Sequence, residues 1–179
     1  MSKGDVNGDG LEDVFIGAPK DGKACLYLQT QNGQFKLAAS QPWQQENNCD
    51  QVQSIFFDAD NDKDLDLYIV NGGNENEDRA AYQDKLYLND GKAGFKLSKD
   101  ALPAMLTSKS CVSIADYNND GKPDIFVGGR LVRGAYGITP ISYLLQNQSG
   151  KGVVKFADVT ASVAPSLQHA PVLDRKSVV

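Results

Sequence analysis

Short apolar runs of β type recur along the chain, separated by stretches rich in glycine, asparagine and aspartate. Three of these runs directly follow an acidic stretch and end in small residues, at 14–18, 67–73 and 125–129. Two further apolar runs follow each of them and are joined by a tight turn, for example Asn32-Gly33. Asn-Gly between apolar runs is a strong hairpin signal, because both residues tolerate positive φ. The pattern predicts strands throughout and no helix of useful length.

The same order of elements occurs three times: strand, acidic loop, strand, longer loop, strand, tight turn, strand. Four antiparallel strands in a repeat of roughly 50 residues are typical of a β-propeller blade. The sequence therefore predicts an all-β fold of about three propeller-like blades in an incomplete ring. The expected boundaries are 4–50, 51–108 and 109–160 for the blades, with 161–179 as the start of a further blade or a disordered tail.

Two details of the repeat are expected to hold in the structure. The first blade should lack a strand before Asp5, because almost no chain precedes that residue. In the hairpins, residues 26–29 should correspond to 86–89 and 143–146, and Phe35 should correspond to Phe95 and Val154.

The acidic stretches share the pattern Asp-x-Asp/Asn-x-Asp-Gly-x-x-Asp and start at residues 5, 58 and 116. Oxygens at positions 1, 3, 5 and 9 of such a loop can converge on one centre, and position 7 can add its backbone carbonyl. Calcium takes about six to eight hard oxygen ligands, and carboxylates forced together need a cation. The sequence therefore predicts about three Ca²⁺ ions, one for each loop. The side-chain ligands would be Asp5, Asn7, Asp9, Asp13, Asp58, Asp60, Asp62, Asp66, Asp116, Asn118, Asp120 and Asp124, and the carbonyl ligands would be Leu11, Asp64 and Lys122.

The second loop departs from the pattern at Lys63, where the other two loops have Gly10 and Gly121. A lysine in the left-handed conformation costs about 1 kcal/mol. The fourth aspartate of this loop, in turn, strengthens the attraction for an ion. The balance of these opposing effects leaves the second site open.

Two other interpretations of the acidic loops are less satisfactory. An EF-hand shares nearly the same first six positions but needs a glutamate at position 12, where this chain has Ile16, Ile69 and Val127. The acids could instead only form turns, since Asp, Asn and Gly are turn formers. Three matched loops with the same ligand positions and the same following strand favour metal binding over this alternative.

Composition excludes several classes of partner. The formal net charge is −5, with 23 acidic and 18 basic residues, whereas nucleic-acid binding needs a clustered basic face. No window approaches the roughly 18 apolar residues of a membrane-spanning helix, so we expect no membrane insertion. Cys25, Cys49 and Cys111 have no CxxC spacing, which disfavours zinc. A Cys25–Cys49 disulfide and free thiols both stay open, and the single histidine, His169, is expected to be solvated.

The loops and the runs that follow them resemble FG-GAP repeats, also called VCBS repeats, known from the β-propeller of integrin α subunits. The first copy, Val-Phe-Ile-Gly-Ala-Pro at 14–19, is close to the FG-GAP signature, and the resemblance covers residues 4–165. The stretch 128–160 is also similar to large secreted or surface-anchored repeat proteins of bacteria, some of which resemble cartilage acidic protein. The resemblance implies calcium-binding loops, a role in adhesion or ligand binding, and an extracellular or cell-surface location. Because family propellers close with about seven blades, it also implies that the chain is a fragment of a larger protein or one part of a larger assembly.

The leading functional hypothesis is a calcium-rigidified scaffold that presents loops 74–84 and 130–136 to a protein or glycan. The alternatives are a non-catalytic part of a secreted polysaccharide-degrading enzyme and a purely structural spacer. We assign no catalytic residue, because acids outside the loops, such as Glu46 and Glu75, form no recognisable arrangement. Exposed edge strands at both ends would permit self-association.

Overall fold

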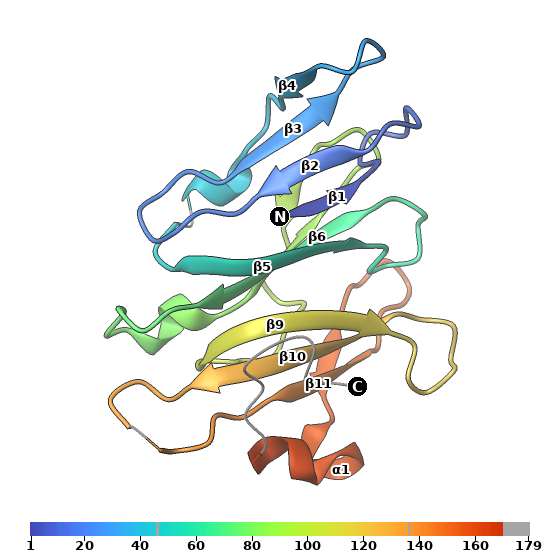
Figure 1. The fold of residues 1–179 in the computed structure, drawn as a ribbon. Coiled ribbons are helices and arrows are strands. Elements are labelled where there is room, and N and C mark those ends of the chain that lie inside the picture. Colours follow the sequence, from blue (N-terminus) through green and yellow to red (C-terminus); the bar gives the residue numbers. More distant parts are fainter. Residues whose placement is uncertain (46, 136, 170–179) are drawn as a thin grey trace.

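The computed structural model describes residues 1–45, 47–135 and 137–169. In this part of the chain, three four-stranded sheets account for all the named strands, and each strand pair is antiparallel. Figure 1 shows the sheets one after another, from the blue first sheet to the yellow and orange third. The prediction of an all-β fold built from incomplete, propeller-like blades is confirmed.

Each sheet is one blade, and its strands are neighbours in chain order. The first blade contains β1 (Ser2–Gly4), β2 (Asp13–Ile16), β3 (Cys25–Gln29) and β4 (Phe35–Leu37). The second contains β5 (Asp50–Phe57), β6 (Asp66–Gly72), β7 (Lys85–Leu88) and β8 (Lys96–Leu97). The third contains β9 (Ser108–Ala115), β10 (Asp124–Leu131), β11 (Tyr143–Asn147) and β12 (Phe156–Asp158).

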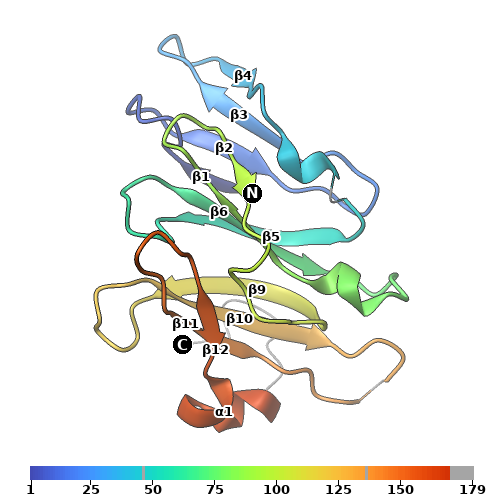
Figure 2. The same ribbon diagram turned by 180° about the vertical axis from the view of Figure 1, so that it is seen from behind.

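Helical structure in the described ranges is limited to short turns. Three of them are 3₁₀ turns at Pro42–Gln45, Arg79–Tyr82 and Pro165–His169, and the fourth is α1 (Thr160–Val163). Figure 2 shows α1 at the end of the third blade, beyond β11 and β12. The predicted tail at 161–179 therefore includes α1 and a 3₁₀ turn, while residues 170–179 lie outside the described part of the chain.

The expectation that no strand precedes Asp5 was wrong. β1 pairs with β2, and Ser2 lies opposite Phe15. A strand of three residues is too short to show a β pattern in the sequence, and its partner supplies the pairing that defines it.

The hairpin of the third blade is also out of step with the alignment expected from the sequence. β10 pairs Ile125 with Leu145 just as β2 pairs Val14 with Tyr27, so Leu145 and not Leu144 corresponds to Tyr27. The same register makes Phe156, not Val154, the counterpart of Phe35. The turn at 148–155 is longer than the turns at 30–34 and 90–94 of the first two blades, and this places Phe156 opposite Asn147.

Both faces of a blade are apolar, because neighbouring blades stack face to face. Successive side chains of a strand point to opposite faces. We call one face of each blade the front face and the other the back face. The front faces carry Val14, Ile16 and Tyr27 in the first blade, Leu67, Ile69 and Tyr87 in the second, and Ile125, Val127 and Leu145 in the third. The back faces carry Phe15 and Leu26, Tyr68 and Leu86, and Phe126 and Leu144, in the same order.

The hydrophobic core lies between the blades. One buried cluster joins the back face of the first blade to the front face of the second, and another joins the back face of the second to the front face of the third. Trp43 sits in the first of these clusters and meets Phe15 edge-on at 5.0 Å and Tyr87 at 5.7 Å between ring centroids. Its indole N–H donates to the Ala24 carbonyl at 3.1 Å, which satisfies the polar atom of this buried ring.

The cysteines do not cross-link the blades. Cys25, Cys49 and Cys111 are free thiols. The buried Cys49 Sγ–H donates to the Gly72 carbonyl at 2.9 Å within the second blade. The disulfide left open by the sequence is therefore not formed.

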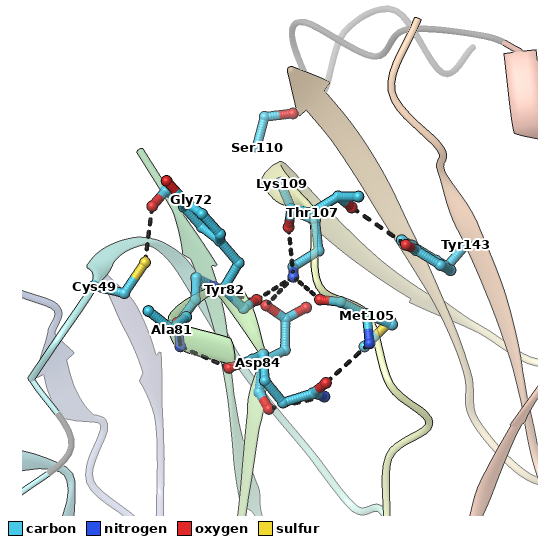
Figure 3. Close-up of polar contacts among 12 residues, drawn as sticks. Cys49, Gly72, Ala81, Tyr82, Asp84, Met105, Thr107, Lys109, Ser110 and Tyr143 are labelled. Carbon is cyan, nitrogen blue, oxygen red and sulfur yellow. Dashed lines mark hydrogen bonds and ion pairs between the residues drawn. The ribbon is translucent and has the colours of Figure 1, made fainter. Parts of the chain in front are cut away.

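A buried ion pair joins the second and third blades (Figure 3). Lys109 of β9 places its Nζ 3.3 Å from Asp84 Oδ1, and both side chains are fully buried. The same ammonium donates to the carbonyls of Tyr82, Met105 and Thr107. Burial lowers the pKa of Lys109 and raises the pKa of Asp84, and the ion pair opposes both shifts. No sequence pattern indicates this pair, because its partners are 25 residues apart and belong to different blades.

Removing the Lys109 ammonium should strongly destabilise the protein. In Lys109→Met the aliphatic stem stays, but a buried Asp84 carboxylate loses its counterion, which costs about 3 to 5 kcal/mol of unfolding free energy. Urea denaturation measures this change. Adding Asp84→Asn to Lys109→Met should restore part of the loss, because the second change removes the unpaired charge.

The matched control is Lys3→Met, which removes an exposed pair with Glu12. Surface ion pairs contribute less than about 1 kcal/mol. Equal unfolding free energies for Lys109→Met and Lys3→Met would contradict the view that Lys109 forms a stabilising buried ion pair between the second and third blades.

Candidate metal centres in the acidic loops

The first aspartate of each acidic loop folds the loop around its own carboxylate. Asp5 accepts the backbone N–H groups of Gly8 and Gly10, each at 2.8 Å. Asp58 accepts those of Asn61 at 2.6 Å and Lys63 at 3.0 Å, and Asp116 accepts that of Gly121 at 2.8 Å. The three loops therefore share one backbone conformation, as their common sequence pattern predicts.

Two residues in each loop adopt the left-handed conformation. At position 6, Lys63 has a φ of 79° and so matches Gly10 and Gly121, which both have 83°. Lysine thus takes the conformation that glycine adopts without strain, at a cost of about 1 kcal/mol. Position 4, which the sequence analysis did not single out, is also left-handed. Its residues, Gly8, Asn61 and Asn119, are of the types that adopt this conformation most readily.

The last aspartate of each loop is buried and ties the loop to the third strand of its blade. Asp66 Oδ2 accepts the Ala59 N–H at 2.9 Å, and Asp66 Oδ1 accepts the Asn89 N–H at 2.8 Å. The same pair of bonds recurs at Asp13, with Val6 and Gln29, and at Asp124, with Tyr117 and Asn147. Each of these carboxylates therefore closes the loop and fixes it to β3, β7 or β11.

An asparagine then connects each of the last two loops to the loop of the preceding blade. Asn89 Nδ2 donates to the carbonyl of Val6 at 2.8 Å and to that of Leu65 at 3.1 Å. Asn147 Nδ2 repeats this, with the carbonyls of Ala59 at 3.0 Å and Pro123 at 3.1 Å. We call these contacts the asparagine links. The sequence analysis missed them, because they are contacts between blades that no local pattern marks.

The second loop brings its carboxylates closest together. In the chain outside 46, 136 and 170–179, Asp58, Asp60 and Asp66 are the one group of three acids with ligand oxygens all within 4.8 Å of one another. Asp60 Oδ1 and Asp64 Oδ1 are buried and have no hydrogen-bond partner. Buried acceptors without donors are costly, and a cation would satisfy them. The residues of this loop therefore fit a hard divalent cation.

Proton binding responds to the same crowding. Burial raises the pKa of Asp66 to about 7, against hydrogen bonds from Asn89 and Ala59 that lower it. Burial and then the neighbouring Asp62 raise the pKa of Asp64 to about 7. Burial and the charge of Asp62 also raise the pKa of Asp60. Asp64 was expected to contribute only its carbonyl, yet its side chain is part of this crowded group.

The first and third loops are arranged differently, because asparagine stands at position 3. Asn7 Nδ2 donates to Asp9 Oδ2 at 3.1 Å, and Asn118 Nδ2 donates to Asp120 Oδ2 at 2.9 Å. An amide donor in place of a third carboxylate relieves the repulsion that the second loop retains. Burial raises the pKa of Asp13 and Asp124, as it does for Asp66.

In the first and third loops, hydrogen bonds within the loop connect several of the predicted ligands. The residue at position 7 donates its backbone N–H to the aspartate at position 5. Leu11 donates to Asp9 Oδ1 at 2.9 Å, and Lys122 donates to Asp120 Oδ1 at 3.0 Å. In the second loop, the N–H of Asp64 bonds Asp62 Oδ1 at 3.1 Å. Metal binding at the first and third loops stays a prediction, and the loop with Lys63, which the sequence left open, has the tightest carboxylate group.

A family model described as an FG-GAP-like repeat matches residues 5–69 and 58–127. Each match begins at the first aspartate of an acidic loop and ends in the second strand of the next blade. No curated protein matches the chain. None of the helices that the structure describes has the length and apolar character to span a membrane.

The raised carboxyl pKa values predict an unusual dependence of stability on pH in the metal-free protein. A carboxyl with an ordinary pKa of 3.8 and a folded value of about 7 stabilises the fold fully below its ordinary value. That stability is lost as pH rises through about 7. We therefore expect the unfolding free energy in EDTA, measured by urea denaturation, to fall between about pH 5 and pH 8.

Asp64→Asn should make this fall shallower, because it removes one of the two titrating carboxyls. Asp100→Asn, which changes an exposed acid outside the loops, should leave the slope unchanged. A stability in EDTA that rises steadily from pH 5 to pH 8 would contradict the crowding of these carboxylates.

Proposed function

The chain belongs to the FG-GAP-like repeat family, and from this we propose that it is a calcium-stabilised scaffold that binds a protein or glycan outside the cell. The observation that carries the calcium part is the second loop. Three of its five aspartates, Asp58, Asp60 and Asp66, have ligand oxygens within 4.8 Å of one another, and Asp60 Oδ1 is buried without a partner. Calcium is the divalent ion that best suits a flexible set of carboxylate and carbonyl oxygens.

A bound cation in a loop would neutralise the clustered carboxylates. Hydrogen bonds from the loop would carry this stabilisation to the neighbouring strand and to the preceding blade. Asp66 holds the loop to β7 through the N–H of Asn89, and the side chain of Asn89 reaches the loop of the preceding blade. Metal binding is thereby linked to the stacking of the blades, and so to the stability of the whole fold.

The surface that we propose for the partner lies at the two longer loops, 74–84 and 130–136. Arg133 connects them, because its Nε donates to the Asn74 carbonyl at 3.2 Å and its guanidinium lies 3.6 Å from Glu77. A cavity of about 570 Å³ opens between Asn74 and the segment from Arg130 to Pro140. Residue 136, part of this predicted surface, lies outside the described residues.

We propose a non-catalytic role for the chain. Glu75, Glu77 and Asp78 are exposed acids of the longer loop, and Asp84 is engaged by Lys109. Exposed acids such as the first three lack the enclosed surroundings that shift the pKa of a general acid or base toward its working range. This supports a binding scaffold over an enzyme.

Calorimetric titration of EDTA-stripped protein with calcium tests the metal part of the proposal. We expect about three ions per chain and a melting temperature that rises with calcium. Asp60→Asn, Asp9→Ala and Asp120→Ala should each lose about one ion. Asp100→Asn, outside the loops, should lose none. No heat of binding at millimolar calcium, together with a melting temperature that EDTA does not change, would refute the proposal.

The partner surface has a separate test. Glycan arrays and immobilised extracellular proteins are screened with the calcium-loaded chain, and any ligand is retested on Arg133→Ala. Truncating a central arginine at an interface should weaken binding at least about tenfold. Lys3→Ala, which changes an exposed cation of β1, should bind normally. Equal binding by Arg133→Ala would place the ligand elsewhere, and no ligand at all would favour a structural spacer.

A further inference from the structure

One position in the repeat is buried in two blades and exposed in the third. The register of the hairpins makes Phe35, Phe95 and Phe156 equivalent, since each lies opposite the last residue of the third strand or the residue after it. Phe95 is 6% exposed and Phe156 is 1% exposed, whereas Phe35 is 50% exposed. The phenylalanine at this position is therefore covered by neighbouring residues in the second and third blades, whereas in the first blade the described residues leave half of it exposed.

The rest of the first front face shares this exposure. Ile16 is 46% exposed, while its equivalents Ile69 and Val127 are 1% and 0% exposed. Val14, Ile16, Tyr27 and Phe35 line an apolar hollow of about 280 Å³. Large apolar side chains gathered in one open patch mark an interaction surface more often than scattered ones do.

The molecule itself contains the cover that such a face takes. In the second and third blades, the front face packs against the back face of the preceding blade, on an aromatic residue and a leucine. These are Phe15 and Leu26 at one junction and Tyr68 and Leu86 at the other. The natural complement of the first front face is therefore a further back face of the same kind.

The third blade presents such a back face. Phe126 and Leu144 hold the positions of Phe15 and Leu26, but they are only half-buried. With Ser113, Ala115 and Tyr117 they line a hollow of about 210 Å³. Among the residues that the structure describes, no blade covers the front face of the first blade or the back face of the third, and these two faces lie at opposite ends of the stack.

We propose that copies of this chain associate head to tail, with the first front face of one copy stacked on the third back face of the next. The contact continues the two junctions inside the chain. It extends to the asparagine links, because Gln29 holds the position of Asn89 and Asn147, and Tyr117 holds the position of Val6 and Ala59. The Gln29 amide of one copy then faces the Tyr117 carbonyl of the next. The sheet faces, not the edge strands expected from the sequence, form this contact, and it does not depend on the calcium proposal.

A head-to-tail contact uses two different surfaces, so it either closes a ring or continues as a chain of copies. Sedimentation equilibrium of the calcium-loaded chain, over micromolar concentrations, should therefore show dimers or larger species. A front-blocked variant, Ile16→Glu with Phe35→Glu, and a back-blocked variant, Ala115→Arg, should each associate at least about tenfold more weakly. All three positions are exposed, so the folded copies should be retained, which circular dichroism checks. Val153→Glu, at an exposed apolar residue in the turn at 148–155, should associate normally.

Mixing the two blocked variants gives the sharpest test. The front-blocked copy keeps a free back face and the back-blocked copy keeps a free front face, so the mixture should form one-to-one pairs and nothing larger. A wild-type chain that stays monomeric at all concentrations would overturn the proposal, and would leave these faces to blades of another polypeptide. A back-blocked variant that still forms dimers alone would overturn the head-to-tail arrangement in favour of front-to-front contact.

Discussion

A carboxylate buried at the end of each acidic loop must receive hydrogen bonds or a cation, because an isolated charge inside a protein is costly. Asp13, Asp66 and Asp124 meet this requirement with backbone N–H groups from two directions. One donor lies at the start of the same loop, and the other lies at or just after the end of the third strand. The loop, the second strand and the third strand of every blade are thereby fixed to one another, and the rest of the blade is built on this arrangement.

In the second and third blades, the residue at or just after the end of the third strand, which donates to the buried aspartate, also connects neighbouring blades. Asn89 and Asn147 donate their N–H to the buried aspartate and their side-chain amide to the loop of the preceding blade. The apolar faces of the blades stack beside these links, and Lys109 with Asp84 adds a charged contact between the second and third blades. An ion in a loop would therefore act on the junctions as well as on the loop, which explains how a small site can stabilise an open stack of blades.

The sequence was sufficient for much of this arrangement. The acidic pattern located the loops, and the apolar runs with their tight turns located most strands, because both depend on residues close together in the chain. The register of the third hairpin was predicted wrongly. Its strands were aligned on residue type, and residue type alone does not show where a longer turn begins and ends. The Lys109–Asp84 pair and the asparagine links are contacts between blades, and no local pattern marks them. At the site, the glycines at position 6 of two loops indicated the sharp turn in advance. The crowding of carboxylates around Asp60 and Asp64 is visible only in the folded structure.

We propose that the second acidic loop holds a calcium ion between the carboxylates of Asp58, Asp60 and Asp66. Anomalous X-ray scattering from crystals grown in millimolar calcium, recorded at a long wavelength, tests it most directly. We expect an anomalous peak within bonding distance of oxygens from all three residues, and loss of that peak in Asp60→Asn crystals grown in the same way. Well-ordered density for the loop with no anomalous peak among these carboxylates would contradict it.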